Sequence, residues 1–161
     1  MADGSDRMEL RSILTSTRVG ALSLTTRPTL EPTDTVADAA AEMRNASHGC
    51  AIVCRDGKIV GIFTERDLLR VIGGGGSLET PLSSAMTAQP RTVSVDDTLF
   101  SATRWMDQGG YRRLPVIDSS GAAVGIIDVK AIAQFLVEHF PAAVYNQASH
   151  AQSLAKNREG A

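Results

Sequence analysis

Two stretches of this chain have nearly the same pattern, and this internal repeat is the strongest constraint on the fold. The first stretch reads HGCAIV, then a turn glycine, then GIFT; the second reads RRLPVI, then a turn glycine, then GIID. The offset is constant at 64 residues, both from His48 to Arg112 and from Gly61 to Gly125. A duplicated unit of this size predicts two copies of one supersecondary unit, packed about a pseudo-twofold axis.

Each copy reads as strand–helix–strand–strand–helix. In the first copy, two expected strands at 50–54 and 58–63 are joined by Asp56-Gly57, a strong hairpin signal, and a helix is expected at 65–72. In the second copy a short strand is expected at 92–95, followed by a helix and by a hairpin of 116–117 and 124–127. The apolar helix positions lie at i, i+3, i+4 and i+7 spacing, namely Val36, Ala39, Ala40 and Met43, then Leu99, Ala102, Thr103 and Met106, and finally a longer buried stripe of Val129, Ile132, Ala133, Leu136 and Phe140.

The domain organisation follows from these elements. We expect an N-terminal extension with a short helix at 1–20, a first unit at 21–72 and a second unit at 81–140. A glycine-rich linker at 73–80 joins the units, and a polar tail follows at 141–161. The glycines are not a phosphate loop, because Ser77-Leu78-Glu79 follows them instead of Lys-Ser/Thr. One unit is too small for a stable core of its own, so the predicted fold class is α+β with two units packed sheet to sheet.

Composition places the chain among soluble globular proteins. Hydrophobic residues make up 43% of the 161 residues and charged residues 21%. The net charge of −2 gives no reason to expect a nucleic-acid or membrane partner. No apolar run reaches the roughly 18 residues of a membrane span, and the first residues lack a signal-peptide core. We therefore expect a cytoplasmic protein.

The junction between the second strand and the second helix of the first copy carries the candidate chemistry. Thr64 is placed as an N-cap and Asp67 as the third helical residue, so both fit a capping box. At the equivalent junction of the second copy Asp128 still serves as a cap, but Ala131 replaces the second acid. Because capping survives in both copies while the acid does not, the asymmetry favours a ligand held by the first copy only.

A nucleotide fits the chemistry of this junction. A helix N-terminus favours a phosphate, and Thr64 and Arg66 add a hydroxyl and a guanidinium. Asp67 is an acceptor for a vicinal diol such as that of a ribose. The spacing alone is equally compatible with a purely structural role, in which both side chains only cap the helix.

The chain resembles a tandem pair of cystathionine-β-synthase (CBS) domains, the Bateman module. The resemblance rests on GIFTERD at 61–67, AMT at 85–87, YRRLPVID at 111–118 and GII at 125–127, and it covers about residues 18–140. It implies the strand–helix–strand–strand–helix unit and a regulatory module without an obligatory cofactor. It also implies binding of an adenosine nucleotide (AMP, ADP or ATP, as in energy sensing, or else S-adenosylmethionine or a dinucleotide such as NAD) in a cleft between the units.

The resemblance also implies residue roles. Asp67 would hold the ribose, and Thr64 and Arg66 the phosphate, while the adenine would lie near Ala51. Basic residues before the second strand would face the central cleft: His48, Arg112 and Arg113. Of these, Arg113 is the residue we expect to reach the phosphate. Family members commonly form a homodimer, a disc of four units, and signal to a target protein that the sequence does not identify.

Two departures from the family pattern limit these roles. Asp128 and Ala131 remove the ribose acceptor from the second copy and put a carboxylate where a phosphate would lie, so a second site is not expected. The strand opening His48-Gly49-Cys50-Ala51 replaces the usual hydrophobic-Pro-Val.

Three other functions stay open as alternatives. One is an interaction protein whose site has decayed. The second is an enzyme, although no nucleophile–base pair or pair of carboxylates supports it. The third is a metal- or redox-responsive protein using His48, Cys50 and Cys54, whose spacing matches no zinc pattern. We expect no disulfide, because cysteines four residues apart in a strand are about 13 Å apart.

Overall fold

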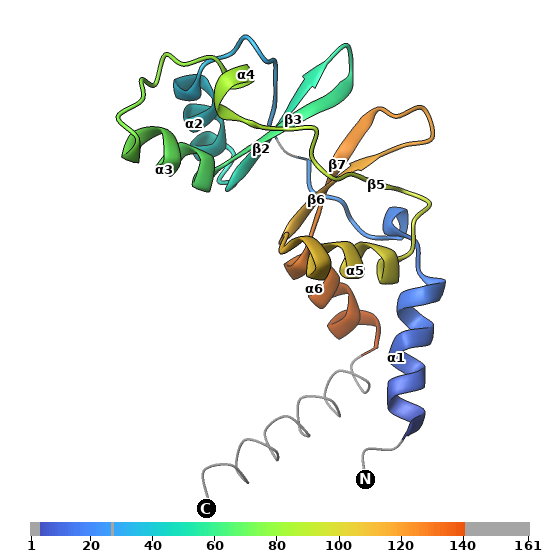
Figure 1. The fold of residues 1–161 in the computed structure, drawn as a ribbon. Helices are drawn as coiled ribbons and strands as arrows, with labels where there is room; N and C mark the ends of the chain where they lie inside the picture. The colour runs from blue at the N-terminus through green and yellow to red at the C-terminus, as the bar shows by residue number, and fades with distance from the viewer. Residues whose placement is uncertain (1–3, 27, 141–161) are drawn as a thin grey trace, which may run out of the picture. The chain divides into compact units, whose positions relative to one another are not determined.

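The computed structural model describes residues 4–26 and 28–140, and its elements follow the order that the repeat predicts (Figure 1). The expected polar tail at 141–161 lies outside the described residues. The chain forms two compact units. The sheet unit comprises Leu24–Val95 and Arg113–Ile127; the helix unit comprises the described parts of 1–23, 96–112 and 128–161.

The sheet unit holds both β-sheets. In the first sheet the strand order is β1 (Thr29–Leu30), β2 (Cys50–Arg55), β3 (Lys58–Thr64) and β4 (Thr87–Ala88). Strand β1 is parallel to β2, whereas β2–β3 and β3–β4 are antiparallel. In the second sheet the order is β5 (Val93–Ser94), β6 (Arg113–Ile117) and β7 (Ala123–Asp128). The parallel pair β5–β6 repeats the β1–β2 pairing, so both copies have the predicted α+β topology.

The hairpin between β2 and β3 is closed by the turn that the sequence predicts. Asp56 has φ 51° and Gly57 has φ 75°, so both central residues are left-handed. A two-residue turn of this kind matches the right-handed twist of the flanking strands. It aligns β3 with β2, with Ala51 opposite Phe63.

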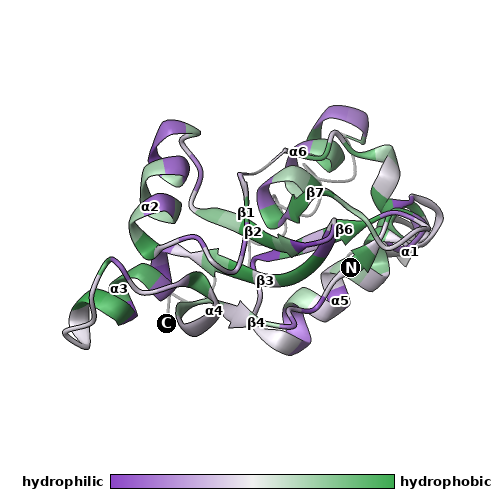
Figure 2. Ribbon diagram, turned by 90° about the horizontal axis from the view of Figure 1, so that it is seen from above, coloured by the Kyte–Doolittle hydropathy of each residue, from purple (hydrophilic) through white to green (hydrophobic). Residues whose placement is uncertain are grey.

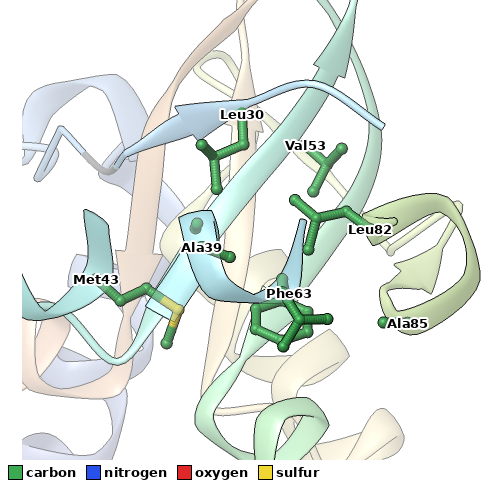
Figure 3. Close-up of a cluster of buried hydrophobic side chains, with 9 residues drawn as sticks. Leu30, Ala39, Met43, Val53, Phe63, Leu82 and Ala85 are labelled. Carbon is green, nitrogen blue, oxygen red and sulfur yellow. The ribbon is translucent and has the colours of Figure 1, made fainter. Parts of the chain in front are cut away.

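Strand β2 is buried on both of its faces. On one face Ala51 and Val53 pack with Phe63 against α2 (Val36–Asn45) and α4 (Leu82–Ala85), in the cluster drawn in Figure 3. On the other face Cys50, Ile52 and Cys54 form a cluster with Ile62 of β3 and Ile126 of β7. The two sheets therefore pack face to face inside the sheet unit, and β2 is coloured as hydrophobic in Figure 2.

The segment after α3 (Glu65–Gly73) is held against the helices of the first repeat by main-chain hydrogen bonds. Gly74 and Gly76 donate to Arg70 O and Val71 O at 3.0 and 2.8 Å, closing the end of α3. Further along, Leu78 O and Thr80 O accept from the first N–H groups of α2 at 2.9 Å each. The expected linker thus supplies acceptors for helix-end donors that would otherwise be unsatisfied.

In the helix unit, the N-terminal helix α1 (Gly4–Ser16) packs on α5 (Leu99–Gly109). The Leu99 N–H donates to Thr17 O at 2.9 Å, and the Arg11 guanidinium lies 5.6 Å from the centre of the Phe100 ring. The short helix η1 (Val19–Ala21) follows, with Val19 fully buried. Helices α1 and η1 therefore contribute Ile13 and Val19 to the core of this unit.

Helix α6 (Val129–His139) differs from its prediction. Of the expected stripe, Ile132 is buried, whereas Val129 is 50% exposed and Ala133 is also exposed. Phe140 lies beyond the helix, since a residue before a proline disfavours helical backbone. The error has a physical cause: periodicity identifies an apolar face but does not establish that another element covers it.

Among the described residues, no helix combines the length and apolar character that crossing a bilayer requires.

Truncation of Phe63 tests the packing of the cluster that β2 and β3 form with α2 and α4. Phe63 is fully buried, so Phe63→Ala should lower the free energy of unfolding by about 3–5 kcal/mol. Glu42→Ala is the control, because Glu42 is exposed on α2 and its loss should change stability by less than about 0.5 kcal/mol. Chemical denaturation measures both; equal effects would contradict the assigned core.

Candidate functional site

The start of α3 is a complete capping box. The Asp67 N–H donates to Thr64 Oγ1 at 3.3 Å, and the Thr64 N–H donates to Asp67 Oδ2 at 2.9 Å. The Thr64 hydroxyl also lies 2.9 Å from Asp67 Oδ2. These contacts satisfy two N–H groups of the first turn and fix both side chains. The capping geometry read from the sequence is therefore confirmed.

Asp67 has two further partners, which sequence reasoning missed. Arg70 Nη2 lies 2.6 Å from Asp67 Oδ1 in an ion pair, and the Thr87 hydroxyl of β4 donates to the same oxygen at 3.4 Å. A carboxylate offers about four acceptor positions, and here each oxygen has two donors. The carboxyl group is thus fully engaged within the protein, and Asp67 is only 3% exposed.

Arg70 has a sequence signal that spacing could have revealed. It follows Asp67 at i+3, a separation at which opposite charges on a helix are neighbours. Its Nη2 also donates to Ala85 O at 3.2 Å, so one guanidinium links α3 to the last residue of α4. The Arg70 side chain is nevertheless 63% exposed.

A second capping box in the same chain shows what capping alone requires. At α2 the Thr35 N–H donates to Asp38 Oδ2 at 2.9 Å, and the Asp38 N–H donates to Thr35 Oγ1 at 3.2 Å. The hydrogen bonds from the Thr35 main chain and hydroxyl hold the pKa of Asp38 below its ordinary value. Asp38 is exposed, however, so burial of the acid is not a requirement of the cap.

Residues of both repeats meet beside Gly49, within the sheet unit. A Cβ atom placed on Gly49 would lie 3.1 Å from Arg113 Nη2 and 3.1 Å from Glu65 Oε2. Glu65 is the first residue of α3, and its N–H donates to Gly49 O at 3.2 Å. The missing side chain at Gly49 therefore gives the Arg113 guanidinium room beside the N-terminus of α3.

The remaining predicted residues occupy different environments. Arg66 is exposed on the first turn of α3, and His48 is half-buried with its N–H donating to Met43 O at 2.8 Å. The Ala51 side chain is fully buried in the core cluster with Phe63. Arg112 is exposed and belongs to the helix unit, where its carbonyl accepts from the Val129 N–H at 3.1 Å.

The equivalent junction of the second repeat keeps the cap. Asp128 Oδ1 accepts from the Ala131 N–H at 2.7 Å, in place of the threonine hydroxyl of the first repeat. Ala131 supplies no carboxylate, as the sequence states.

Both cysteines are buried. Cys50 and Cys54 form no disulfide, and burial raises the pKa of the Cys54 thiol. A raised pKa disfavours the thiolate that ligates metals and attacks disulfides. Within residues 4–26 and 28–140, no group of three potential metal-ligating side chains is assembled.

Each unit has a cavity among its described residues. One, of about 280 Å³, lies in the sheet unit and is lined by Arg70, Val71, Gly74, Gly76, Thr80, Ser84 and Ala85. The other, of about 310 Å³, lies in the helix unit and is lined by Thr103, Met106, Asp107, Tyr111, Val129 and Ile132. Arg70 therefore stands between the buried Asp67 carboxylate and an open cavity.

Comparison with known proteins identifies the class. A model of the CBS domain family matches the chain twice, at residues 19–74 and 82–138. An uncharacterized 17.7 kDa protein of Acidianus ambivalens is 30% identical over 124 residues, which are 76% of this chain and 75% of that protein. A CBS domain-containing protein of Arabidopsis thaliana is 36% identical over 102 residues, 62% of this chain but 19% of that protein.

Solved structures agree with this class. A CBS-domain containing protein from Agrobacterium tumefaciens is similar with a TM-score of 0.66 and 30% identity, covering 73% of this chain and 98% of that one. A CBS domain protein from Pyrobaculum aerophilum, solved with AMP, gives a TM-score of 0.67 at 24% identity, covering 71% and 89%. The chain belongs to the CBS domain family and carries two copies of the domain.

The two capping boxes supply a matched test of the buried acid. Asp67→Ala removes the carboxylate half of the capping box together with the partner of Arg70 and Thr87, and should lower the free energy of unfolding by about 2 kcal/mol. Asp38→Ala removes only the exposed carboxylate half of the other capping box, so its effect should be smaller. Urea denaturation of both variants at pH 7 measures the difference, and equal losses would show that the additional contacts of Asp67 add no stability.

Proposed function

We propose that this chain is a regulatory module that senses an adenosine nucleotide at the N-terminus of α3. The observation that carries the proposal is the arrangement beside Gly49, where Arg113 of the second domain lies next to the first turn that contains Thr64 and Asp67. A related fold has been solved with AMP. The proposed site uses residues of both CBS domains but lies within the sheet unit.

The proposed contacts follow from the chemistry of the side chains. The phosphate would lie at the start of α3, where the helix dipole favours an anion and Thr64 and Arg66 supply a hydroxyl and a guanidinium. Arg113 would approach it from the side of Gly49. The ribose diol would bind to Asp67, and the adenine would lie near β2 at Ala51. His48 is proposed as an outer basic residue of the same site, whereas Arg112 belongs to the helix unit and is left out of it.

Glu65 bears on which nucleotide is bound. Its carboxylate lies beside the same Gly49 position as the Arg113 guanidinium, and it offsets part of the positive charge available to the phosphate. A ligand with fewer negative charges is therefore favoured, so we place AMP ahead of ATP. A role in energy sensing rests on this same preference.

We further propose a homodimer that forms a disc of four CBS domains and transmits occupancy to a target protein. Support comes from apolar side chains that remain exposed, Leu69 and Ile72 on α3 at 70% and 55%, and Val129 on α6 at 50%. The two cysteines, which form no disulfide, fit a reducing compartment such as the cytoplasm.

Calorimetric titration tests the proposed site. Wild-type protein should bind AMP, and Asp67→Ala should weaken binding by at least about tenfold, because a hydrogen bond to a charged group contributes about 1.5–3 kcal/mol. Asp38→Ala is the control and should bind as wild type does. The same titrations with ADP, ATP, NAD and S-adenosylmethionine rank the ligands, and analysis of each nucleotide after incubation detects turnover. Equal responses of wild type and Asp67→Ala to every compound would overturn the proposal, and turnover would assign an enzyme instead.

Neutralising Glu65 tests whether its charge sets the preference for AMP over ATP. Glu65→Gln should raise the affinity for ATP more than the affinity for AMP, because it removes a negative charge beside the phosphates. Arg113→Gln should lower the affinity for both nucleotides, and the affinity for ATP more strongly. Competition binding at two salt concentrations measures these ratios, and the differences should shrink at high salt. A ratio of ATP to AMP affinity that neither variant changes would place the phosphates elsewhere.

A further inference from the structure

The Asp67 carboxylate has no acceptor position left for a ribose. Thr64 occupies Oδ2 through its N–H and hydroxyl, while Arg70 and Thr87 occupy Oδ1. A ribose diol that binds this carboxylate must therefore replace a partner that is already present. The inference below rests on the proposed function and concerns the residue that is replaced.

We propose that Arg70 is an internal competitor for the ribose, and that ligand binding exchanges the Arg70 guanidinium for the ribose diol on Asp67. The pair is short, at 2.6 Å, and its acidic partner is almost completely buried. Charge-assisted hydrogen bonds of this kind are about twice as strong as neutral ones. Arg70 therefore lowers the apparent affinity of the site and sets the nucleotide concentration to which it responds.

On Oδ1 the Thr87 hydroxyl is held only weakly at 3.4 Å, so Arg70 at 2.6 Å is the strong partner that a ribose diol must displace. The contacts of Thr64 belong to the helix cap and are tied to its own main chain, so their loss would fray the first turn of α3. Arg70 is 63% exposed, so water can hydrate the released guanidinium at once. It also lines the cavity of about 280 Å³, which provides space for the side chain to move away from Asp67.

The exchange also has a structural consequence. The same Nη2 that contacts Asp67 donates to Ala85 O, the last residue of α4. Release of Arg70 therefore breaks a link between α3 and α4 at the moment when the ribose binds. Because the second CBS domain begins at residue 82, the loosened contact joins α3 of the first CBS domain to the first helix of the second.

Arg70→Met is the direct test, because it keeps an apolar stem and removes the guanidinium. Calorimetry with AMP should show affinity about tenfold higher than wild type, which corresponds to loss of one competing charge-assisted hydrogen bond. The gain should be smaller for 2′-deoxyadenosine monophosphate, which has one hydroxyl fewer to offer Asp67. Arg104→Met, an exposed arginine on α5, is the matched control and should bind as wild type does.

The outcomes separate the two proposals. Equal AMP affinity in wild type and Arg70→Met overturns the competitor role and leaves the nucleotide site standing. Weaker binding by Arg70→Met also overturns it, because Arg70 would then be a ligand contact. Binding of AMP by Arg70→Met but not by wild type supports the proposal, because Arg70 would then block the site completely. No binding by either protein overturns both proposals.

A measurement on the wild-type protein tests the same exchange without relying on correct folding of the variant. In nitrogen-15 NMR spectra, the Arg70 guanidinium protons should exchange slowly with water in the free protein, because they are held by Asp67 and Ala85. Saturating AMP should make this exchange as fast as that of Arg104. Protection of Arg70 that persists in the AMP-saturated protein would overturn the exchange.

Discussion

Both faces of strand β2 are buried, and the rest of the sheet unit is arranged around this strand. Its odd positions Ala51 and Val53 pack toward α2 and α4, while Ile52 and the two cysteines face the second sheet. Because side chains alternate along a strand, a slip of one residue would exchange the two cores. The register of β2 therefore fixes where β3 ends, and with it the position at which α3 and the capping box begin.

The two capping boxes show how tertiary context changes the chemistry of one local motif. Thr35–Asp38 and Thr64–Asp67 have nearly the same hydrogen-bond lengths. One acid stays in solvent, whereas the other is covered by β4 and Arg70 and has become the centre of a polar network. The difference lies in Arg70 of the same helix and Thr87 of a later strand rather than in the box, which is why the motif by itself left two interpretations open.

The sequence was sufficient for the repeat, the order of elements, the Asp56-Gly57 turn and the caps, because each depends on residues close together in the chain. It did not reveal Thr87 on Asp67 or the room that Gly49 leaves for Arg113, since these contacts join segments that only the folded sheet unit brings together. The i+3 spacing of Arg70 is itself a sequence signal for its ion pair with Asp67. The predicted burial of Val129 failed for the opposite reason: a local pattern was read as a tertiary contact.

The glycine-rich segment after α3 has an evolutionary consequence. Its glycines are exposed, but Leu78 and Thr80 are fastened to the first turn of α2 by their carbonyl groups. Residues inserted among the glycines would bulge outward and leave those two carbonyls in register, whereas an insertion after Thr80 would shift Leu82 out of the first core. Relatives of this chain should therefore vary in length before Leu78 and stay constant between Leu78 and Leu82. Length variation in this segment would thus distinguish the glycine part, which tolerates insertions, from the part that holds α2.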